Sequence, residues 1–489
     1  MIRVTILSLI VSFLVVYAWK DWFKALCGLI ILTGVLEHPD MPKQLMGISG
    51  LNLWNILFLS VCLSWVRAKR IEQLDLSFPP NIRRYLLFYI VVVVVGVVRL
   101  MTDDSGVLAF ATLQGEPIPT ATQYLSEYLI NTIKFAFPCL LIYSGCRSKS
   151  RVYVATGSIL AMYVVLALLT IKAVKFGVFT MSGDALQSRA HRVLPDNVGF
   201  HRVNLSMMFS GAAWALFACR EMISNKRTRL LLLYLSVITV LAMASTGGRM
   251  GYVTWGALSV VLILTRWRKL MLAIPLVAIA VLIYMPSVIE RMAFGLSDDQ
   301  YAAATPHLSD SDVGLYQMTS GRSLAWPLVL EKIQEAPLLG HGREAMINSG
   351  ITMETYHRFG QYDTFSHPHN AYLQWILDNG LVGFLPLFLF YLAIIRCSFS
   401  LFRDRSNGIS AAVGGICLSL VGALLIASFG SQSFYPREGS IGMWCAIGLM
   451  LRVYVERARL LEEGNKQFLD ENSDTKKHNP DILATIRAR

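Results

Sequence analysis

The chain has 489 residues, of which 54% are hydrophobic and 16% are charged, and its mean hydropathy is +0.51. Soluble proteins carry about 25% charged residues, so this composition excludes a soluble or disordered chain and favours a polytopic membrane protein. The net charge of +12 does not indicate a nucleic-acid partner, because the basic residues lie between apolar segments. The eight cysteines include no Cys-x-x-Cys spacing, so the sequence offers neither a zinc nor a redox motif.

Apolar runs of about 15–20 residues, the length needed to cross a bilayer as helices, recur along nearly the whole chain. The segments that we predict as helices are 4–18, 24–36, 47–66, 85–99, 127–145, 152–172, 204–219, 230–245, 250–265, 270–286, 372–395, 409–430 and 440–454. The first two are short, so we predict an all-α polytopic membrane protein with about 12–13 transmembrane helices. The N-terminus lacks a small-x-small cleavage site, and we expect a membrane anchor there rather than a removed signal peptide.

Basic residues mark alternate loops of this arrangement. Eighteen of them fill five loops, namely Arg67, Lys69, Arg70, Arg83, Arg84, Arg147, Lys149, Arg151, Arg220, Lys226, Arg227, Arg229, Arg266, Arg268, Lys269, Arg396, Arg403 and Arg405. The loop at 100–125, on the other side, has none. Positively charged loops stay in the cytoplasm, so we predict that these five loops are cytoplasmic and that the loops between them are external.

The pattern divides the chain into three parts. Residues 1–203 are predicted to form N-terminal transmembrane helices with an outer loop near 174–203. Residues 204–454 are predicted to form a transmembrane core that includes a large outer loop at 287–371 with short helices in it. Residues 455–489 are predicted to form a charged cytoplasmic tail that is partly disordered.

Seven of the nine histidines lie in the two long outer loops. Histidine titrates near neutral pH, so this clustering favours chemistry on the outer side, although loops also simply hold polar residues. The segment 366–370, Ser-His-Pro-His-Asn, precedes an apolar run. Serine can cap a helix and proline is tolerated in a first turn, so we predict that a helix begins here with His369 at its outer mouth. Gly380 and Gly383 follow, where small residues let another helix approach closely.

Two arginines are predicted to lie at helix starts on the outer side. Arg249 lies in a turn at 246–251 that is too tight to lift it far above the bilayer. Arg322 opens a segment that ends at 337–342 and that we predict to begin with a short amphipathic helix. A helix N-terminus favours anions, and the planar guanidinium group binds phosphate oxygens in bidentate fashion. Both positions therefore suit a phosphate.

A second basic cluster precedes the segment at 204–219. Arg192 and Arg202 each follow a histidine there, and Arg189 lies close by. A neutral histidine can act as a general base, and arginines can stabilise charge on a leaving diphosphate. A base together with arginines is what glycosyl transfer from a lipid diphosphate requires.

Structural explanations and metal binding are open alternatives for these residues. Outer arginines often only anchor at lipid head groups, and a histidine can serve as a helix cap. The His367–His369 pair could bind a metal, but further spaced ligands are missing. Asp310 and Asp312 form an acidic pair of the kind that holds a divalent cation, although a solvated loop explains them better. We therefore predict neither a metal site nor a cofactor.

Three blocks together resemble the O-antigen ligase and polymerase superfamily. They are His369-Asn370 followed after nine residues by Gly380 and after two more by Gly383, the turn 246–251 with Arg249, and the block 321–342 with Arg322. The first resembles the periplasmic histidine motif of O-antigen ligases. The single large outer loop late in the chain agrees with that topology. The resemblance is best over about 204–430, while the first 200 residues match only in hydropathy.

This resemblance implies an inverting membrane glycosyltransferase of the GT-C type that needs no metal or nucleotide cofactor. It would take a glycan from undecaprenyl diphosphate at the periplasmic face of a bacterial inner membrane. By the same resemblance, His369 is the catalytic base and Arg249 and Arg322 hold the diphosphate. The third arginine is Arg192 or Arg202, where the local pattern is looser. Asn370 and His367 are expected to contact substrate.

Members of this superfamily differ in the acceptor. Ligases use lipid A–core, polymerases use a second lipid-linked repeat, and related enzymes use protein serine or exopolysaccharide. The histidine spacing favours a ligase, with a polymerase as the alternative. A transporter of the same lipids is a further alternative, although Lys134 is the only clearly intramembrane charge and the sequence has no internal repeat. A nonenzymatic assembly protein for envelope polysaccharide is the last alternative.

Overall fold

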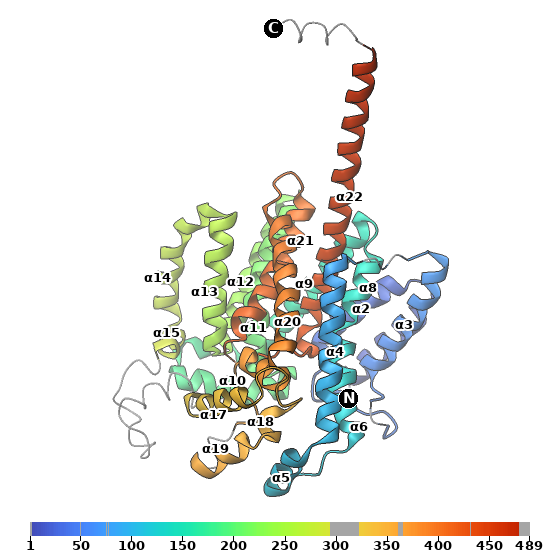
Figure 1. The fold of residues 1–489 in the computed structure, drawn as a ribbon. Helices are drawn as coiled ribbons and strands as arrows, with labels where there is room; N and C mark the ends of the chain where they lie inside the picture. The colour runs from blue at the N-terminus through green and yellow to red at the C-terminus, as the bar shows by residue number, and fades with distance from the viewer. Residues whose placement is uncertain are drawn as a thin grey trace, which may run out of the picture.

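The computed structural model is a bundle of helices that run roughly side by side (Figure 1). It describes residues 2–48, 50–74, 76, 78–293, 322–359, 365–430 and 432–478. Every regular element in these ranges is helical, and no strand occurs in them, which confirms the all-α prediction. The pair Asp310 and Asp312 lies outside the described residues, as does Gly321.

Helices lie in all of the predicted segments, but several begin or end well away from the predicted boundaries. They are α1 Ile2–Tyr17, α2 Trp22–Leu36, α3 Leu53–Ile71, α4 Pro80–Thr102, α5 Ser105–Gln114, α6 Ala121–Tyr124, α7 Asn131–Ala136, α8 Pro138–Gly145, α9 Lys149–Val174, α10 Gly183–Val198, α11 Arg202–Cys219, α12 Lys226–Ser245, α13 Arg249–Thr265, α14 Ile274–Tyr284, α15 Pro286–Ala293, α17 Arg322–Glu335, α18 Ala345–Asn348, α19 Ile351–Phe359, α20 Ala371–Arg403, α21 Gly408–Ala427 and α22 Ile441–His478. A π-helix, η1 Leu125–Ile130, joins α6 to α7, and 3₁₀ turns occur at η2 Phe176–Thr180, η3 Arg220–Met222, η4 Arg268–Ala273 and η7 Glu438–Ser440.

The chain crosses a membrane several times. Among the described residues, six helical stretches are long and apolar enough to span. They are Pro80–Thr102, Ala121–Gly145, Lys149–Val174, Lys226–Ser245, Ala371–Arg403 and Gly408–Ala427. A seventh span exists if Arg268–Tyr284 and Pro286–Ala293, which meet at 97°, count as one.

This criterion does not reach the predicted 12–13 spans. Helices occupy all of the predicted segments, but several are too short to qualify, among them Ile2–Tyr17, Trp22–Leu36 and Arg249–Thr265. Hydropathy therefore located the helices, and six or seven of them in the described residues meet this criterion in full.

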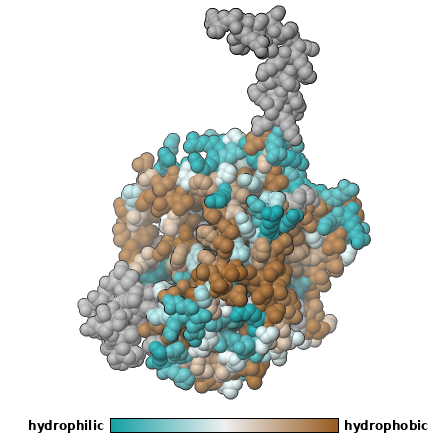
Figure 2. All heavy atoms as spheres, viewed as in Figure 1, coloured by the Kyte–Doolittle hydropathy of each residue, from teal (hydrophilic) through white to brown (hydrophobic). Residues whose placement is uncertain are grey.

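The two ends of the bundle differ in character. Hydrophobic side chains fill much of the middle of the face in Figure 2, and hydrophilic ones gather toward both ends. The predicted basic loops lie together at the upper end in Figure 1, which we name the basic end. Arg266 ties three of them together there, since its guanidinium lies 3.0 Å from Glu221 and 2.9 Å from the carbonyl oxygen of Phe402. Helices α5, α10, α15 and α17–α19 lie at the opposite end, which we name the loop end.

Small residues hold the centre of the bundle together. Helices α11 and α21 pack against each other along much of their lengths, and both are largely buried. A Cβ atom on Gly211 of α11 would lie 2.9 Å from the Cβ atom of Ala423 and 3.0 Å from the carbonyl oxygen of Ser419. Close helix approach of this kind is how membrane helices gain packing without a hydrophobic driving force.

Two helices of the outer loops were not predicted. Helix α10 is polar and contains Pro195, so the apolar pattern gives no sign of it. Helix α5 lies in the loop at 100–125 and has only 10 residues. The segment after 454, predicted as a partly disordered tail, continues α22 as a helix to His478.

A break in α20 shapes the loop end. Gly380 has φ 62° and ψ −171°, so the helix is interrupted there. The block 337–342 repairs the break, because the N–H of His341 donates to the carbonyl of Leu377 at 2.8 Å and the N–H of Leu381 donates to the carbonyl of Pro337 at 2.9 Å. Backbone groups freed inside a membrane protein need such partners. The two glycine-containing motifs of the sequence therefore form one unit.

Replacing Gly380 with alanine is expected to remove most of the folded protein. This conformation is essentially restricted to glycine, and a Cβ atom would lie 2.2 Å from the carbonyl oxygen of Leu338. Gly256 of α13 is the matched control, because a Cβ atom there meets nothing within 4 Å. The measurement is the yield of monodisperse protein in size-exclusion chromatography. Equal yields for Gly380→Ala and Gly256→Ala would contradict the role of the break.

Candidate active site

Three of the predicted arginines lie near one another at the loop end. Arg202, Arg249 and Arg322 are the first residues of α11, α13 and α17. Arg202 lies within electrostatic range of the other two, and Arg322 lies within range of Arg249. All three are half-buried. Helix starts carry partial positive charge, so three helices present both their ends and their guanidinium groups to the same region.

The turn between α12 and α13 fixes two of these arginines. The Nη1 group of Arg202 donates to the carbonyl of Gly247 at 3.1 Å, and Ser206 donates to that of Gly248 at 3.1 Å. Gly247 has φ 64°, which favours glycine. A Cβ atom on Gly251 would lie 1.6 Å from the hydroxyl of Ser206, so α11 and α13 are in direct contact there. The Gly-Gly-Arg turn therefore places Arg249 beside Arg202.

A fourth arginine joins the group, and the sequence analysis missed it. Arg291 of α15 is 4% exposed and lies within electrostatic range of Arg202 and Arg249. Its guanidinium lies 3.7 Å from the carboxylate of Asp184 on α10. No motif marks this residue, which lies in the second helix of the bent pair at 268–293. We name Arg202, Arg249, Arg291 and Arg322 the arginine cluster.

The predicted histidines lie beside this cluster. The rings of His367 and His369 have centroids 4.1 Å apart. Between them, the carbonyl of Pro368 accepts a hydrogen bond from the indole of Trp326 at 3.0 Å, which ties this segment to α17. His369 has φ 51°, a conformation that few non-glycine residues adopt. Such positions occur often at functional sites, where the surrounding structure maintains them.

The environment keeps both histidines neutral. Burial lowers the pKa of His369 to about 3, and His367, Arg322 and His201 add to the effect. Burial likewise lowers the pKa of His367 to about 4, with Arg437 as the next cause. A neutral imidazole can accept a proton, which a general base must do.

The arginines stay charged in the same surroundings. Burial lowers the pKa of Arg322 to about 10, and Arg249 contributes to this shift. A guanidinium with that pKa is still protonated at neutral pH. Several like charges gathered in a half-buried region repel one another, and a bound anion would offset that repulsion. The cluster therefore has the charge and the geometry of an anion site beside a neutral imidazole.

The other predicted site residues have different places. Asn370 caps α20, because its side-chain oxygen accepts from the N–H groups of Tyr372 and Leu373 at 3.0 and 3.2 Å. Helix α20 begins at Ala371, one residue before the predicted start at 372, so His369 lies at its outer mouth as predicted, but the cap is Asn370 and not Ser366. An asparagine side chain offers a stronger cap at that point than the proline-containing segment before it. Asn370 thus has a structural task that holds His369 at the helix mouth.

Only one arginine of the second basic cluster lies at the site. Arg202 lies in the arginine cluster, while Arg192 is exposed on α10 and no contact in the described part of the chain links it to the cluster. Arg189 donates to the carbonyl of Val174 at 2.9 Å. His201 caps α11 and lies against His191, with ring centroids 5.7 Å apart. Of the three arginines considered, Arg202 is the one near Arg249 and Arg322.

A buried ion pair supports the break in α20. Asp378 is 1% exposed and lies 3.3 Å from Arg343, which also pairs with Glu344 at 3.2 Å. Tyr435 donates to Asp378 at 2.9 Å and stacks against the guanidinium of Arg343 at 3.6 Å. The sequence suggested that Lys134 is the only charge in a predicted span, but Asp378 is a second one. The sequence patterns did not single out Asp378, because it lies about two helical turns inside an apolar run.

Part of the chain is similar in sequence to known proteins. Residues 234–389 match the family described as O-Antigen ligase, and this range includes Arg249, Arg291, Arg322 and His369. A curated protein of Haemophilus influenzae (strain ATCC 51907 / DSM 11121 / KW20 / Rd), called "Uncharacterized protein", is 29% identical over 221 residues. The match covers 40% of this chain and 50% of that relative, so it spans about half of the relative's length. The chain is therefore a multi-pass membrane protein whose residues 234–389 are similar to the O-antigen ligase family.

Proposed function

We propose that the protein transfers a glycan from undecaprenyl diphosphate to an acceptor hydroxyl, and that the acceptor is lipid A–core. The observation that carries the proposal is the convergence of the arginine cluster with the neutral His369 at one end of the bundle. The similarity to the O-antigen ligase family supplies the substrate class, since lipid-linked glycans are what this family implies.

His369 is the proposed general base. Its imidazole takes the proton of the acceptor hydroxyl as the oxygen attacks the anomeric carbon of the donor sugar. The bond from that carbon to the diphosphate oxygen breaks, so the configuration inverts and the diphosphate leaves. His367 is the neighbour whose ring packs against His369 and limits how it can turn.

The arginine cluster is the proposed diphosphate site. Negative charge grows on the bridging oxygen as the bond breaks, and fixed guanidinium groups stabilise that charge without reorganising. Arg249 and Arg322 hold the diphosphate, and Arg202 is the proposed third ligand. The bound diphosphate also reduces the positive field around His369, which raises the basicity of the imidazole when the donor is present.

Orientation follows from the charge of the loops. We propose that the basic end faces the cytoplasm and that the loop end faces the periplasm of a bacterial inner membrane. Helix α22 then extends into the cytoplasm. This places the arginine cluster on the side where a lipid-linked glycan waits after it has crossed the membrane.

A glycan gel of the host with His369→Ala on the chromosome tests the proposed function. Lipid-linked and lipid A-linked material are separated before the gel. Long chains that accumulate on the lipid diphosphate and vanish from lipid A are the expected result for a ligase. Single repeats left on lipid A would instead indicate a polymerase. No change in either fraction would contradict both assignments and would favour a transporter, an assembly protein or another acceptor.

The pH dependence of transfer is expected to lack an acid limb near 6.5. The quotient kcat/KM for the donor reports the free enzyme. The pKa of His369 is lowered to about 3, so the base stays neutral as the pH falls, and kcat/KM should be flat between about pH 5 and pH 8. The acid limb of kcat should lie at higher pH, because the bound diphosphate raises the pKa. A fall of kcat/KM below about pH 6.5, as for a solvent-exposed histidine, would contradict this environment.

A further inference from the structure

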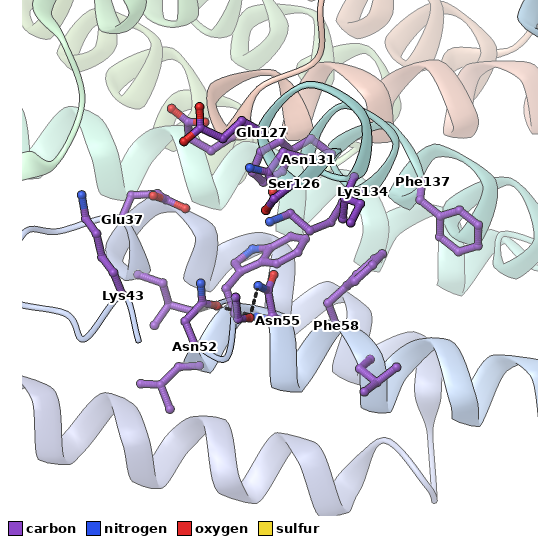
Figure 3. Close-up of a pocket in the computed structure, with 18 of the residues that line it drawn as sticks. Glu37, Lys43, Asn52, Asn55, Phe58, Ser126, Glu127, Asn131, Lys134 and Phe137 are labelled. Atoms are coloured by element: carbon purple, nitrogen blue, oxygen red, sulfur yellow. Dashed lines mark hydrogen bonds between the residues drawn. The ribbon is translucent and has the colours of Figure 1, made fainter. Parts of the chain in front are cut away.

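A large cavity lies in the N-terminal half of the chain, outside the residues that are similar to the O-antigen ligase family. Its volume is ≈1050 Å³ (Figure 3). The loop between α2 and α3, helix α3, the π-helix η1 and helix α7 form its walls, and Glu438 of η7 completes them. A π-turn inside a membrane helix often marks a functional site. None of the residues assigned above to the base or to the diphosphate site lines this cavity.

The lining changes from polar to apolar along α3. Asn52 and Asn55 lie in the cavity at the start of that helix, and Phe58 and Cys62 line it further along. These ten residues cover about 15 Å along the helix axis, so the lining changes character over that distance. On the opposite wall, Ser126, Glu127 and Asn131 are followed by Ile133 and Phe137 in the same order. The cavity is therefore amphipathic, with a polar rim toward the loop end and an apolar floor inside the membrane.

Lys134 places a cation inside this cavity. Its ammonium lies 5.1 Å from the ring centroid of Trp54 and 4.4 Å from that of Phe135. Figure 3 shows the amine pointing into the space between α7 and α3. An ionisable residue in a membrane span is expensive and usually serves a function. The aromatic rings stabilise the charge from one side and leave its donors available to a ligand.

Two further polar groups point to a ligand with many hydroxyls. The side-chain oxygen of Asn55 is buried without a hydrogen-bond partner, while its amide nitrogen donates to the carbonyl of Gly50 at 2.6 Å. Burial raises the pKa of Glu37 to about 7, and Glu438 contributes to the shift. Such a carboxyl group can donate or accept a hydrogen bond near neutral pH. Both groups suit a sugar ring, whose hydroxyls donate and accept.

The charges of the lining nearly balance. The acidic side chains are Glu37, Glu127 and Glu438, and the basic ones are Lys43 and Lys134. A diphosphate would need a clear excess of positive charge, which the arginine cluster has and this cavity lacks. An uncharged polyhydroxyl headgroup fits better.

One loop connects this cavity to the arginine cluster. Glu438 lines the cavity, while Arg437 lies within electrostatic range of His367. Earlier in the same loop, Gln432 donates to the carbonyl of Val203, next to Arg202, at 3.4 Å. A molecule in the cavity therefore meets the same loop that approaches His367.

We infer that the cavity binds the acceptor of the transfer as an amphipathic glycolipid, with its sugar hydroxyls at the polar rim and its acyl chains on the apolar floor. This inference rests on the proposed function and names the second substrate's site. Asn55 accepts from a sugar hydroxyl, Lys134 donates to one, and Phe58 and Phe137 contact the lipid chains.

Filling the cavity tests the inference. Ser126→Trp places an indole in the cavity from η1, and Leu125→Trp is the matched control, because Leu125 is 39% exposed and does not line the cavity. Purified full-length protein is assayed with a lipid-diphosphate glycan as donor and lipid A–core as acceptor. Ser126→Trp is expected to raise the acceptor KM by about tenfold or more, which corresponds to about 1.4 kcal/mol or more, with the donor KM unchanged. Leu125→Trp is expected to change neither.

A second variant keeps the test decisive if the first does not fold. Lys134→Met retains the chain length but removes the donor, so the acceptor KM should rise by a smaller factor, and Lys134→Arg should restore part of it. A rise in the donor KM instead would make the cavity part of the donor site and overturn the inference. An unchanged acceptor KM in both cavity variants would overturn it too. If His369→Ala still abolishes transfer, the proposed function survives that failure.

Discussion

His369→Ala is expected to lower kcat for glycan transfer by about 10²–10⁴-fold, the usual contribution of a general base. The side chain does not cap α20, since Asn370 does so, and the substitution removes a half-buried ring from a loop rather than from the helical core. The protein should therefore insert in the membrane and accumulate at the wild-type level. The measurement is the single-turnover rate with purified protein in nanodiscs, together with its thermal transition.

His357→Ala is the matched control for this experiment. His357 is an exposed histidine of α19 in the same large loop. Its loss should leave the rate unchanged, because it lies outside the His367–His369 pair. If His369→Ala retains the wild-type rate in protein of normal thermal stability, the assignment of the base is wrong.

Arg322→Ala is expected to weaken the donor step more than any other single arginine variant. Arg322 lies within electrostatic range of both Arg249 and His369, so its loss affects the diphosphate site and the base together. Removing one charged donor to a developing anion costs about 10²–10³-fold in kcat. The loss in kcat for Arg249→Ala should be of the same size. Lysine at either position should restore only part of the rate, since lysine cannot bind two oxygens in a planar fork.

Arg358→Ala controls for the loss of a positive charge at the loop end. Arg358 is exposed on α19 and pairs with Glu354 in its own helix. The variant should keep the wild-type donor KM and kcat. A donor response to Arg358→Ala as large as that to Arg322→Ala would mean that net charge, and not the arginine cluster, governs donor binding.

Much of the fold could be predicted because hydropathy reports burial in lipid. Long apolar runs marked the helices, and α17 begins at Arg322, where the sequence predicts a short helix. The number of spans was less predictable, since apolar runs of 15–17 residues form helices that are shorter than a full span. Helix α10 was not predicted because its sequence is polar and includes a proline.

The candidate site could be predicted in part. Arg249, Arg322 and His369 belong to short motifs at helix starts, so local sequence was enough to single them out. Arg291 and Asp378 carry no motif, and only the bend before α15 and the break in α20 bring them to their partners. The contact between Gly380 and the block 337–342 joins residues about 40 positions apart along the chain. Tertiary contacts of this kind leave no periodic signal that a single sequence could show.

Product analysis of the purified protein tests whether it forms a new glycosidic bond. Wild-type protein in proteoliposomes is given a lipid-diphosphate glycan and lipid A–core, and both lipid products are quantified by mass spectrometry. We expect glycosylated lipid A–core and undecaprenyl diphosphate to appear in equal amounts, with the anomeric configuration inverted. Both products should form more slowly with Arg322→Ala than with the wild-type protein. Glycan that crosses the bilayer still attached to its diphosphate, with no new glycosidic bond, would contradict the proposed transfer.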